Sequence, residues 1–253
     1  MSELYYPKCY ALVSGGKDSL STAQALDRAG KLEACVALET GLSTPDWKEF
    51  VARVCDERGW RLEFYRTTAS YDELVVRYGF PGPSKHKWFM DYLKGRGIRA
   101  FRKAHPDGIL ASGVRSGESQ RRLVNTTPVG MWENVPILAP IYQWTTDETW
   151  AYFREHGFER APAYSTLQIS GDCLCGAFAR EDEEAAVRFH YPEIAARFDG
   201  LGEEIKTTHP KRCKWGWGWM RERKKAKNES SLCVECGDTQ PDLYSLLEEK
   251  ILP

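Results

Sequence analysis

The run Ser14-Gly15-Gly16-Lys17-Asp18-Ser19 decides the fold, because it stands between an apolar strand predicted over residues 9–13 and a helix predicted over residues 19–29. Two glycines let the backbone turn tightly and approach an anion, and the free amides at the start of the helix point toward that anion. The lysine in the run adds a positive charge. The run therefore predicts a phosphate-binding loop, with an ordinary strand-to-helix turn as the alternative.

Strands and helices continue to alternate beyond this loop. Apolar residues between positions 47 and 55 recur at helical spacing. Crossovers of this kind imply an α/β fold with a doubly wound, mostly parallel sheet. Ligands of such sheets bind beyond the carboxyl ends of the strands, so the loops after Val13, Glu39 and Ser112 are expected to surround one crevice. Three further strands are predicted, over residues 34–39, 61–67 and 108–112.

Length and composition fit a globular protein. The 253 residues carry a formal net charge of −1 and are enough for one large domain, or for a main domain with an appendage. No apolar run approaches the roughly 20 residues that span a bilayer. Residues 1–8 lack the charged-then-apolar order of a signal peptide. We therefore expect a cytoplasmic protein that does not enter a membrane.

The eight cysteines are unevenly placed, and the last third of the chain carries two close pairs of them. In a reducing compartment such pairs favour a metal site over disulfides. Four thiolates suit either tetrahedral zinc or a [4Fe-4S] cluster, and spacing does not separate the two. Cys213 stands between the pairs and is an alternative ligand. The predicted ligands are Cys173, Cys175, Cys233 and Cys236.

One segment is strongly basic, although the whole chain is not. Residues 206–227 contain nine Lys or Arg against one acidic residue, Glu222. Trp215, Trp217 and Trp219 alternate, which places the three indoles on one face of an extended strand. Aromatic rings flanked by cations suit bases and phosphates, so the segment predicts contact with nucleic acid. The alternative is a tryptophan-rich core with a solvated basic flank.

The loop at residues 14–19 lacks the G-x-x-x-x-G-K-[ST] spacing of kinases and GTPases, because Lys17 directly follows the glycine pair. It resembles instead the PP-loop of the ATP pyrophosphatase superfamily, whose members bind the pyrophosphate of ATP and typically adenylate a substrate. The resemblance implies ATP and Mg²⁺ as cofactors. It assigns the amides and hydroxyls of the loop to the pyrophosphate, Lys17 to neutralising it, and Asp18 to orienting Mg²⁺ or the loop.

The loop after the second strand carries the next part of the resemblance. Glu39-Thr40-Gly41 and Pro45 are similar to the Asp-Thr-Gly…Pro-Glu segment of the phosphoadenosine phosphosulfate (PAPS) reductase family. Glu39 and Asp46 depart from that pattern, but both keep a carboxylate. A glycine-containing turn before a helix is the alternative. The resemblance implies that backbone groups near Ala37 and Leu38 bracket adenine, and that Thr40 and Gly41 contact the nucleotide.

The third loop reads Gly113-Val114-Arg115-Ser116-Gly117-Glu118-Ser119-Gln120-Arg121-Arg122. It resembles the G-V-R-x-x-E-S-x-x-R segment of the PAPS reductase-like family, close to its DNA-phosphorothioation sulfurtransferase-like branch. Arg115 offers paired donors to a phosphate or sulfate, and we expect Glu118 to pair with an arginine or approach a metal. A solvated ion-pair network is the alternative. The resemblance implies nucleotide contacts at Gly113, Arg115, Arg121 and Arg122, and catalytic roles for Lys17, Asp18, Arg115 and Glu118.

The segment over residues 136–150 resembles the P-I-x-x-W-[ST]-x-x-[DE]-V-W pattern of the same family. Its role is architectural: Thr145 or Thr146 is expected to cap a helix, and Trp150 and Phe153 to lie in the core. We therefore expect a PP-loop α/β domain over residues 1–165 and a cysteine-rich, basic C-terminal region over residues 166–253.

Two enzymatic interpretations follow from the resemblance. The leading one is an ATP pyrophosphatase that activates a substrate as an adenylate in sulfur transfer, with nucleic acid as a candidate acceptor and a sulfur donor protein or reductant as partner. The other is a sulfonucleotide reductase that releases sulfite, although Asp238 and Thr239 depart from its E-C-G-x-H motif. Cluster-carrying members of that group have close cysteines followed far downstream by C-x-x-C, and the similar layout here favours a [4Fe-4S] cluster, with zinc as the alternative. A zinc-stabilised nucleotide- or nucleic-acid-binding module is the non-enzymatic alternative. Relatives of this kind often form homodimers.

Overall fold

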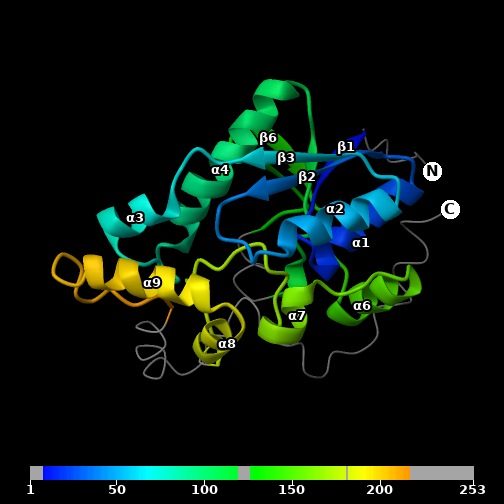
Figure 1. Ribbon diagram of the computed structural model, residues 1–253. Helices are drawn as coiled ribbons and strands as arrows, with labels where there is room; N and C mark the ends of the chain where they lie inside the picture. The colour runs from blue at the N-terminus through cyan, green and yellow to red at the C-terminus, as the bar shows by residue number, and fades with distance from the viewer. Residues whose placement is uncertain (1–7, 119–125, 181, 217–253) are drawn as a thin grey trace.

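The computed structural model describes residues 8–118, 126–180 and 182–216, which form an α/β fold around one six-stranded sheet (Figure 1). The strand order is β3-β2-β1-β4-β6-β5, and all neighbouring pairs are parallel except β5 and β6. This confirms the predicted doubly wound, mostly parallel sheet. The strands are β1 (Cys9–Leu12), β2 (Leu32–Glu39), β3 (Leu62–Arg66), β4 (Leu110–Ala111), β5 (Val129–Trp132) and β6 (Val135–Leu138).

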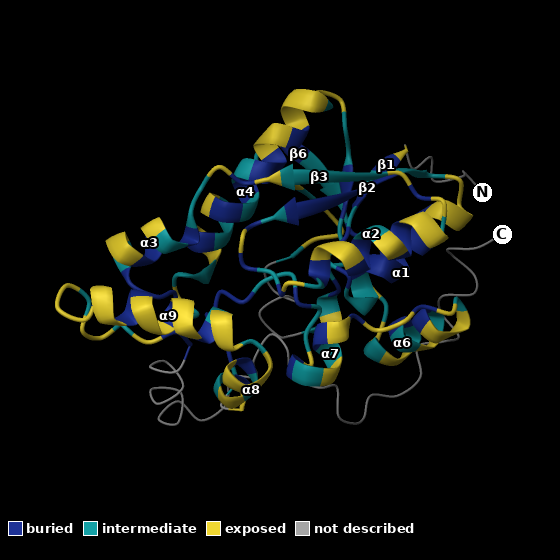
Figure 2. Cartoon of the chain, in the orientation of Figure 1, coloured by how far each residue is buried: buried dark blue, intermediate teal, exposed yellow. Residues whose placement is uncertain are grey.

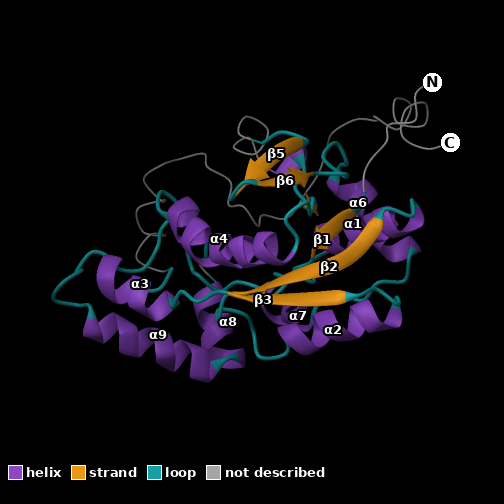
Figure 3. Ribbon diagram, turned by 90° about the horizontal axis from the view of Figure 1, so that it is seen from above, coloured by secondary structure: helices purple, strands orange, loops and turns teal. Residues whose placement is uncertain are grey.

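Helices lie on both faces of the sheet. Figure 3 shows α4 on one face and α2 on the other, with the strands between them. Apolar side chains alternate between the two faces along β2: Ala37 packs toward α1 and α2, and Val36 and Leu38 pack toward α4. The helices are α1 (Lys17–Arg28), α2 (Trp47–Glu57), α3 (Tyr71–Tyr78), α4 (His86–Ala104), α6 (Thr146–Glu155), α7 (Pro162–Leu167), α8 (Glu183–His190) and α9 (Pro192–Glu204).

The switch in winding direction falls between β1 and β4. From β1 the chain moves to β2 and then β3 on one side, and β4 returns to pair with the other side of β1. The loops that leave β1 and β4 therefore diverge at the carboxyl edge of the sheet, and a crevice opens where they part. This is the position predicted for the ligand.

The antiparallel edge was not predicted from the sequence. β5 and β6 form a hairpin in which Trp132 pairs with Val135 across a two-residue turn. The turn residues Glu133 and Asn134 have φ values of 51° and 60°, as a tight hairpin turn requires. Glutamate is an unusual residue in this turn, so the usual Asn-Gly or Asp-Gly signal is missing.

A second apolar cluster lies beyond the sheet, where α3, the start of α4, α8 and α9 meet. Tyr71 and Phe89 from the first half of the chain pack there with Leu167, Phe198 and Trp215. The cluster thus draws on residues from both sides of position 165. The division into 1–165 and 166–253 stays a prediction. In Figure 2 the buried faces of these helices turn inward, and their exposed faces form the surface.

Side-chain caps begin two of the helices, and the one at Thr145 confirms a prediction from the sequence. Thr145 caps α6 with a complete capping box, in which its hydroxyl accepts from the Glu148 N–H at 3.2 Å and the Glu148 carboxylate accepts from the Thr145 N–H. The Ser70 hydroxyl accepts from the Glu73 N–H at 3.4 Å and caps α3. Cys9, Cys35 and Cys55, which stand outside the predicted metal site, are buried in the core.

The prediction for Trp215 as part of an exposed aromatic face was wrong. Its side chain is 1% exposed, its indole N–H donates to the Leu174 carbonyl at 2.7 Å, and its ring stacks on Phe198 at 5.2 Å between centroids. A large ring whose single donor finds a partner gains more from burial than from exposure. Trp217, Trp219 and the rest of the basic segment beyond residue 216 lie outside the described residues. None of the helices described is both long and apolar enough to cross a membrane.

Candidate functional site

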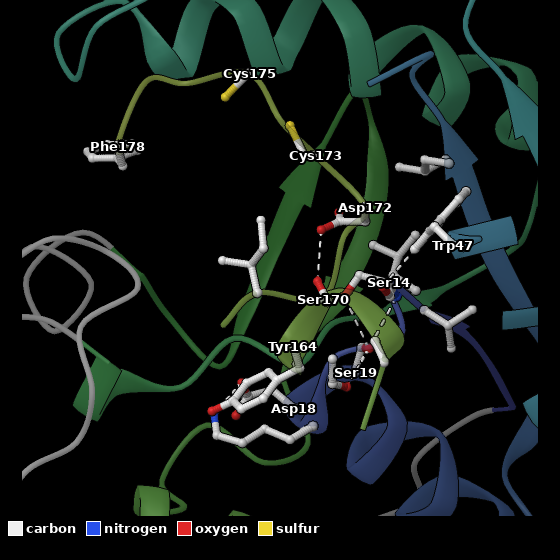
Figure 4. Close-up of a pocket in the computed structure, with 18 of the residues that line it drawn as sticks. Ser14, Asp18, Ser19, Trp47, Tyr164, Ser170, Asp172, Cys173, Cys175 and Phe178 are labelled. Atoms are coloured by element: carbon white, nitrogen blue, oxygen red, sulfur yellow. Dashed lines mark hydrogen bonds and ion pairs between the residues drawn. The ribbon is translucent and has the colours of Figure 1, made fainter. Parts of the chain in front are cut away.

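A cavity of about 1130 Å³ opens at the carboxyl edge of the sheet. The loops after β1 and β4, one face of β2, one face of α4 and the segment from Arg160 to Ala179 form its walls. Figure 4 shows how the PP-loop residues Ser14, Asp18 and Ser19 lie on one side and Asp172, Cys173 and Cys175 on another. The crevice predicted from strand order is therefore present.

The loop between β1 and α1 is held in shape by its own polar groups. The Ser19 hydroxyl accepts from the Ser14 N–H at 3.1 Å and donates to the Gly16 carbonyl at 2.9 Å. Gly16 is the N-cap of α1, and no side chain caps the helix there. Gly15 has φ +80°, where a side chain would be strained. The uncapped amides at the start of α1 thus remain available to an anion.

Trp47 anchors this loop from α2, and sequence reasoning missed it. Its indole N–H donates to the Ser14 carbonyl at 2.9 Å, and the side chain is 2% exposed. Trp47 also lines the cavity. The sequence shows an apolar residue at the start of the helix after the second strand. That pattern predicts burial of the side chain, but not its hydrogen bond to the loop.

Asp18 lies between two cations. One carboxylate oxygen accepts from Lys17 Nζ at 2.7 Å, and the other accepts from Arg115 Nε at 2.5 Å. Lys17 and Arg115 come from different loops, so Asp18 joins the PP-loop to the loop after β4. Because both oxygens are engaged, the geometry favours the loop-orienting role among the two roles predicted for Asp18.

Arg115 is the most buried charged group at this site, with 2% of its side chain exposed. Besides Asp18, its Nη1 donates to the Trp144 carbonyl and to the Thr146 hydroxyl, both at 3.2 Å. The guanidinium therefore ties α1 to the start of α6. Within the described part of the chain, Nη2 is the nitrogen that these bonds leave for a ligand.

Gly113 lets the two loops meet. A Cβ atom at this position would lie 2.6 Å from the backbone carbon of Asp18 and 2.8 Å from the Ser19 nitrogen. Glu118 lines the cavity, and its carboxylate accepts from the Arg115 N–H at 3.4 Å. Arg121 and Arg122, predicted to contact the nucleotide, lie outside the described residues.

Of the residues predicted to contact the nucleotide at the end of β2, some line the cavity and others do not. Leu38 lines the cavity together with Val36, but Ala37 faces the opposite side of β2 and is fully buried in the core. Thr40 is buried, and the Gly41 carbonyl accepts from Arg197 at 3.0 Å on the surface. Neither Thr40 nor Gly41 reaches the cavity wall. Alternation along the strand thus brings Val36, not Ala37, beside Leu38.

Two of the predicted metal ligands, Cys173 and Cys175, lie on the cavity wall. A hydrogen bond from Cys175, helped by the nearby charge of Lys94, lowers the pKa of the Cys173 thiol, and the same thiol contact and burial raise that of Cys175. Adjacent soft donors of this kind fit zinc or a cluster. Cys233 and Cys236 lie outside the described residues, among which no three His, Cys, Asp or Glu side chains form a metal-binding group. Cys213 therefore does not join this pair.

A charged pair that the sequence did not reveal lies beside Cys173 and Cys175, which together are called the thiol wall of the cavity. Lys94 of α4 donates to Asp172 at 2.7 Å, and Asp172 also accepts from the Ser170 hydroxyl at 3.0 Å. Burial opposes the charge of Lys94, but Asp172 and Cys173 outweigh that effect and raise its pKa. The cavity thus carries a fixed cation opposite the PP-loop.

Cations and aromatic rings also meet at the mouth of the cavity. Arg160 stacks over Trp150 at 4.7 Å and over Tyr164 at 4.9 Å, and Lys17 lies 5.6 Å from the Trp150 ring centre. Phe153 is buried as predicted, but Trp150 is only partly buried and lines the cavity. Arg160 and Tyr164 carry no motif, so sequence reasoning had no signal for them.

Glu183 supplies a pH-dependent prediction at the rim of the cavity. Its side chain accepts from the Arg180 N–H at 3.1 Å, and burial raises its pKa above the ordinary 4.5. A raised carboxyl pKa means that stability falls as pH rises from 4.5 through the folded-state value. We expect Glu183→Gln to melt at a higher temperature than the wild type at pH 7, with the difference vanishing toward pH 4.5 and below.

Thermal melts across this pH range check the prediction. Glu184→Gln is the matched control, because Glu184 is exposed and pairs with Arg188 on the same helix; its melting temperature should stay within the small range typical of surface changes. A pH-independent difference for Glu183→Gln would show that packing, and not ionisation, is responsible.

An uncapped helix start, two glycines and a lysine at the switch point of a doubly wound sheet define the PP-loop class of adenine-nucleotide-binding α/β proteins. The model of the phosphoadenosine phosphosulfate reductase domain matches residues 8–202, and the chain belongs to this family.

Individual relatives are distant. A 37.8 kDa protein of the gpa 5′ region of Escherichia phage 186 is 26% identical over 145 residues, which is 54% of this chain and 39% of that protein. The chain therefore spans about two-fifths of the length of this phage relative.

Solved structures show weaker likeness. PAPS reductase from Candida auris in a phosphate complex is 16% identical over 62% of this chain and 76% of that one, with a TM-score of 0.44. FMN adenylyltransferase from Candida glabrata with FAD and inorganic pyrophosphate is 13% identical over 62% and 51%, with a TM-score of 0.41. The subunit of a tRNA methyltransferase from Methanocaldococcus jannaschii is 17% identical over 75% and 88%, with a TM-score of 0.39.

Proposed function

We propose that this chain is a PP-loop enzyme that binds ATP–Mg²⁺ and activates an acceptor by adenylation, with release of pyrophosphate, as a step in sulfur transfer. One observation carries the proposal: Asp18 holds Lys17 beside the uncapped start of α1, and both face a cavity of about 1130 Å³. That volume is at the upper end of the range for small-molecule sites and leaves room for an acceptor beside the nucleotide.

The proposed step is an in-line displacement at the α-phosphorus of ATP. An acceptor oxygen forms a bond to that phosphorus, the bond to the oxygen bridging the α- and β-phosphates breaks, and pyrophosphate leaves with the electron pair. The α1 amides and Lys17 stabilise the charge that grows on the leaving pyrophosphate. Arg115 positions Asp18 and presents Nη2 to the nucleotide, and Val36 and Leu38 offer an apolar wall for adenine.

The thiol wall supports sulfur chemistry at the same cavity. As the alternative to metal ligation by Cys173, its lowered pKa and the nearby charge of Lys94 suit a thiolate that takes the outer sulfur of a donor persulfide while the donor thiolate leaves. When bound, a cluster or zinc ion held by Cys173, Cys175, Cys233 and Cys236 would supply electrons or structural support. Nucleic acid as acceptor, a sulfur donor protein or reductant, and a homodimer belong to the same proposal.

Incubation of the purified chain with radiolabelled ATP and candidate acceptors tests the proposal, because adenylation alone yields labelled pyrophosphate. Lys17→Met should lower pyrophosphate release at least tenfold, since one charge at the leaving group is worth several kcal/mol in a water-poor site. Lys8→Met is the matched control, because Lys8 precedes the opposite end of β1 and is 69% exposed. Equal pyrophosphate release by both variants would remove Lys17 from the site.

A second candidate function is reduction of a sulfonucleotide. Membership of the PAPS reductase domain family and a low-pKa thiol on the cavity wall favour it. In that reaction a thiolate forms a bond to the sulfur of the bound nucleotide, the bond between that sulfur and the phosphate oxygen breaks, and the adenosine phosphate leaves. A thiol reductant then attacks the cysteine sulfur, forms a disulfide with it and frees sulfite. Release of sulfite from adenylyl sulfate or its 3′-phosphorylated form, without pyrophosphate from ATP, would replace the adenylation proposal.

A further inference from the structure

An aromatic ladder lies on the surface where α3 meets α4. It consists of Tyr78, Trp88 and Tyr92. The Tyr78 and Trp88 rings meet edge to face with centroids 4.6 Å apart, and Trp88 and Tyr92 lie 5.5 Å apart, one helical turn from each other on α4. Trp88 is 39% exposed and Tyr92 36% exposed. Rings of this size are seldom left in contact with water in a row, so the ladder needs an explanation beyond packing.

Cations flank the ladder at both ends. Arg77 lies over the Tyr78 ring at 5.2 Å, Lys85 lies 5.9 Å from the same ring, and Arg96 lies over Tyr92 at 4.6 Å. Arg96 also donates to the Thr68 hydroxyl at 3.1 Å. Of the ion pairs between described residues, none includes these three cations. Their charges are therefore available to an anionic partner.

The described start of the basic segment, residues 206–216, contacts α3 and the residues that follow it. Phe80 N–H donates to the Arg212 carbonyl at 2.9 Å, Arg212 Nη1 donates to the Tyr78 carbonyl at 3.5 Å, and a ring nitrogen of His209 lies 3.2 Å from the Val76 carbonyl. Residues 206–227, which are rich in Lys and Arg, thus begin against the end of α3. The ladder residue Tyr78 and the described start of the basic segment are therefore neighbours, although they are far apart in sequence.

We propose that the aromatic ladder, with Arg77, Lys85 and Arg96, is a docking surface for single-stranded nucleic acid. Unpaired bases stack on exposed rings, and phosphates between them meet the flanking cations. A duplex hides the faces of its bases, so the ladder selects single strands. The surface adds a partner site to the proposed function without depending on the reaction, because binding is measured without turnover.

The ladder is separate from the cavity. Trp88, Tyr92 and Arg96 follow one another at four-residue spacing on α4, whereas the α4 residues that line the cavity, His86, Met90 and Lys94, lie about half a turn away. A second copy of the chain is a poorer occupant than nucleic acid. A two-fold contact through this surface would bring the three cations of one copy close to those of the other, and like charges repel.

Fluorescence anisotropy with a labelled oligodeoxythymidylate of about 15 nucleotides tests the surface in the absence of ATP. We expect the wild type to prefer the single strand over a duplex of equal length, and Trp88→Ala to bind it roughly tenfold more weakly. Trp88→Phe keeps a ring and should retain most of the affinity, which separates stacking from a folding defect. Arg77→Gln should reduce the slope of the logarithm of affinity against the logarithm of salt concentration by about one, the value of one phosphate contact.

Phe189→Ala is the matched control, because Phe189 is also a surface aromatic residue, 81% exposed, but lies on α8. Its affinity should equal that of the wild type. Absence of wild-type binding, equal affinity of Trp88→Ala and the wild type, or a dimer that Trp88→Ala splits without any change in binding would overturn the proposal. Pyrophosphate release needs no oligonucleotide in this design, so failure of the docking surface and failure of the proposed reaction are distinguishable.

Discussion

Replacing Arg115 by alanine is expected to lower the free energy of unfolding by about 3–5 kcal/mol and to abolish nucleotide turnover. The guanidinium is 2% exposed and bonds to Asp18, to the Trp144 carbonyl and to the Thr146 hydroxyl. Its loss leaves one Asp18 oxygen and the Trp144 carbonyl without the Arg115 donor, while Lys17 still donates to the other Asp18 oxygen. It also releases Asp18, and with it the position of Lys17.

Urea unfolding and pyrophosphate release measure the two effects separately. Arg115→Lys should recover little of either, because an ammonium group is a point charge and cannot span three acceptors held by a planar fork. Arg53→Ala is the surface control: Arg53 is 45% exposed and pairs with Glu57 and Glu159, so its loss should cost under about 1 kcal/mol. If Arg115→Ala and Arg53→Ala lose similar stability, Arg115 does not join the two loops.

Replacing Gly113 by alanine is expected to weaken ATP binding at least tenfold and to lower the free energy of unfolding by about 1–3 kcal/mol. The added Cβ would lie 2.6 Å from the Asp18 carbon and 2.8 Å from the Ser19 nitrogen, so backbone must move. The amides at the start of α1 would move with it. Because those amides are the proposed pyrophosphate contacts, the loss of affinity should accompany the loss of stability.

Gly117 offers a matched control in the same loop. A Cβ atom there meets nothing within 4 Å, and its backbone needs no positive φ, so Gly117→Ala should bind nucleotide like the wild type. Calorimetric titration with a non-hydrolysable ATP analogue and urea unfolding compare the two variants. Unchanged affinity in Gly113→Ala would mean that the start of α1 tolerates displacement and does not hold the phosphates.

Much of the fold was predictable because it depends on short-range patterns. The first strand, the PP-loop and α1 follow one another within 20 residues, and the positions of Gly15, Lys17 and Thr145 express local turn and cap chemistry. The hairpin of β5 and β6 was missed, since its turn uses Glu133 and Asn134 where a glycine is the usual signal. The prediction that Trp215 is exposed was wrong, because long-range packing alone decides whether a ring is buried.

The candidate site was predicted in outline and not in its contacts. Motif order placed Lys17, Asp18 and Arg115 near one another, but it did not show that Asp18 engages both cations. The side chains of Ala37 and Leu38 lie on different faces of the sheet because strand residues alternate, and the backbone contacts predicted there for adenine stay predictions. The sites of Arg121, Arg122, Cys233 and Cys236 stay predictions.

The sequence by itself determined the first three strands, the loop and helix that follow the first of them, and which loops leave the carboxyl edge of the sheet, because glycine, capping residues and apolar periodicity act over a few residues. Only the tertiary structure decided which side chains share the cavity. Lys94 and Asp172 are 78 positions apart, and Lys17 and Arg160 reach the same Trp150 ring from different elements. Such long-range contacts depend on how the helices pack across the sheet, and no local sequence pattern predicts that packing.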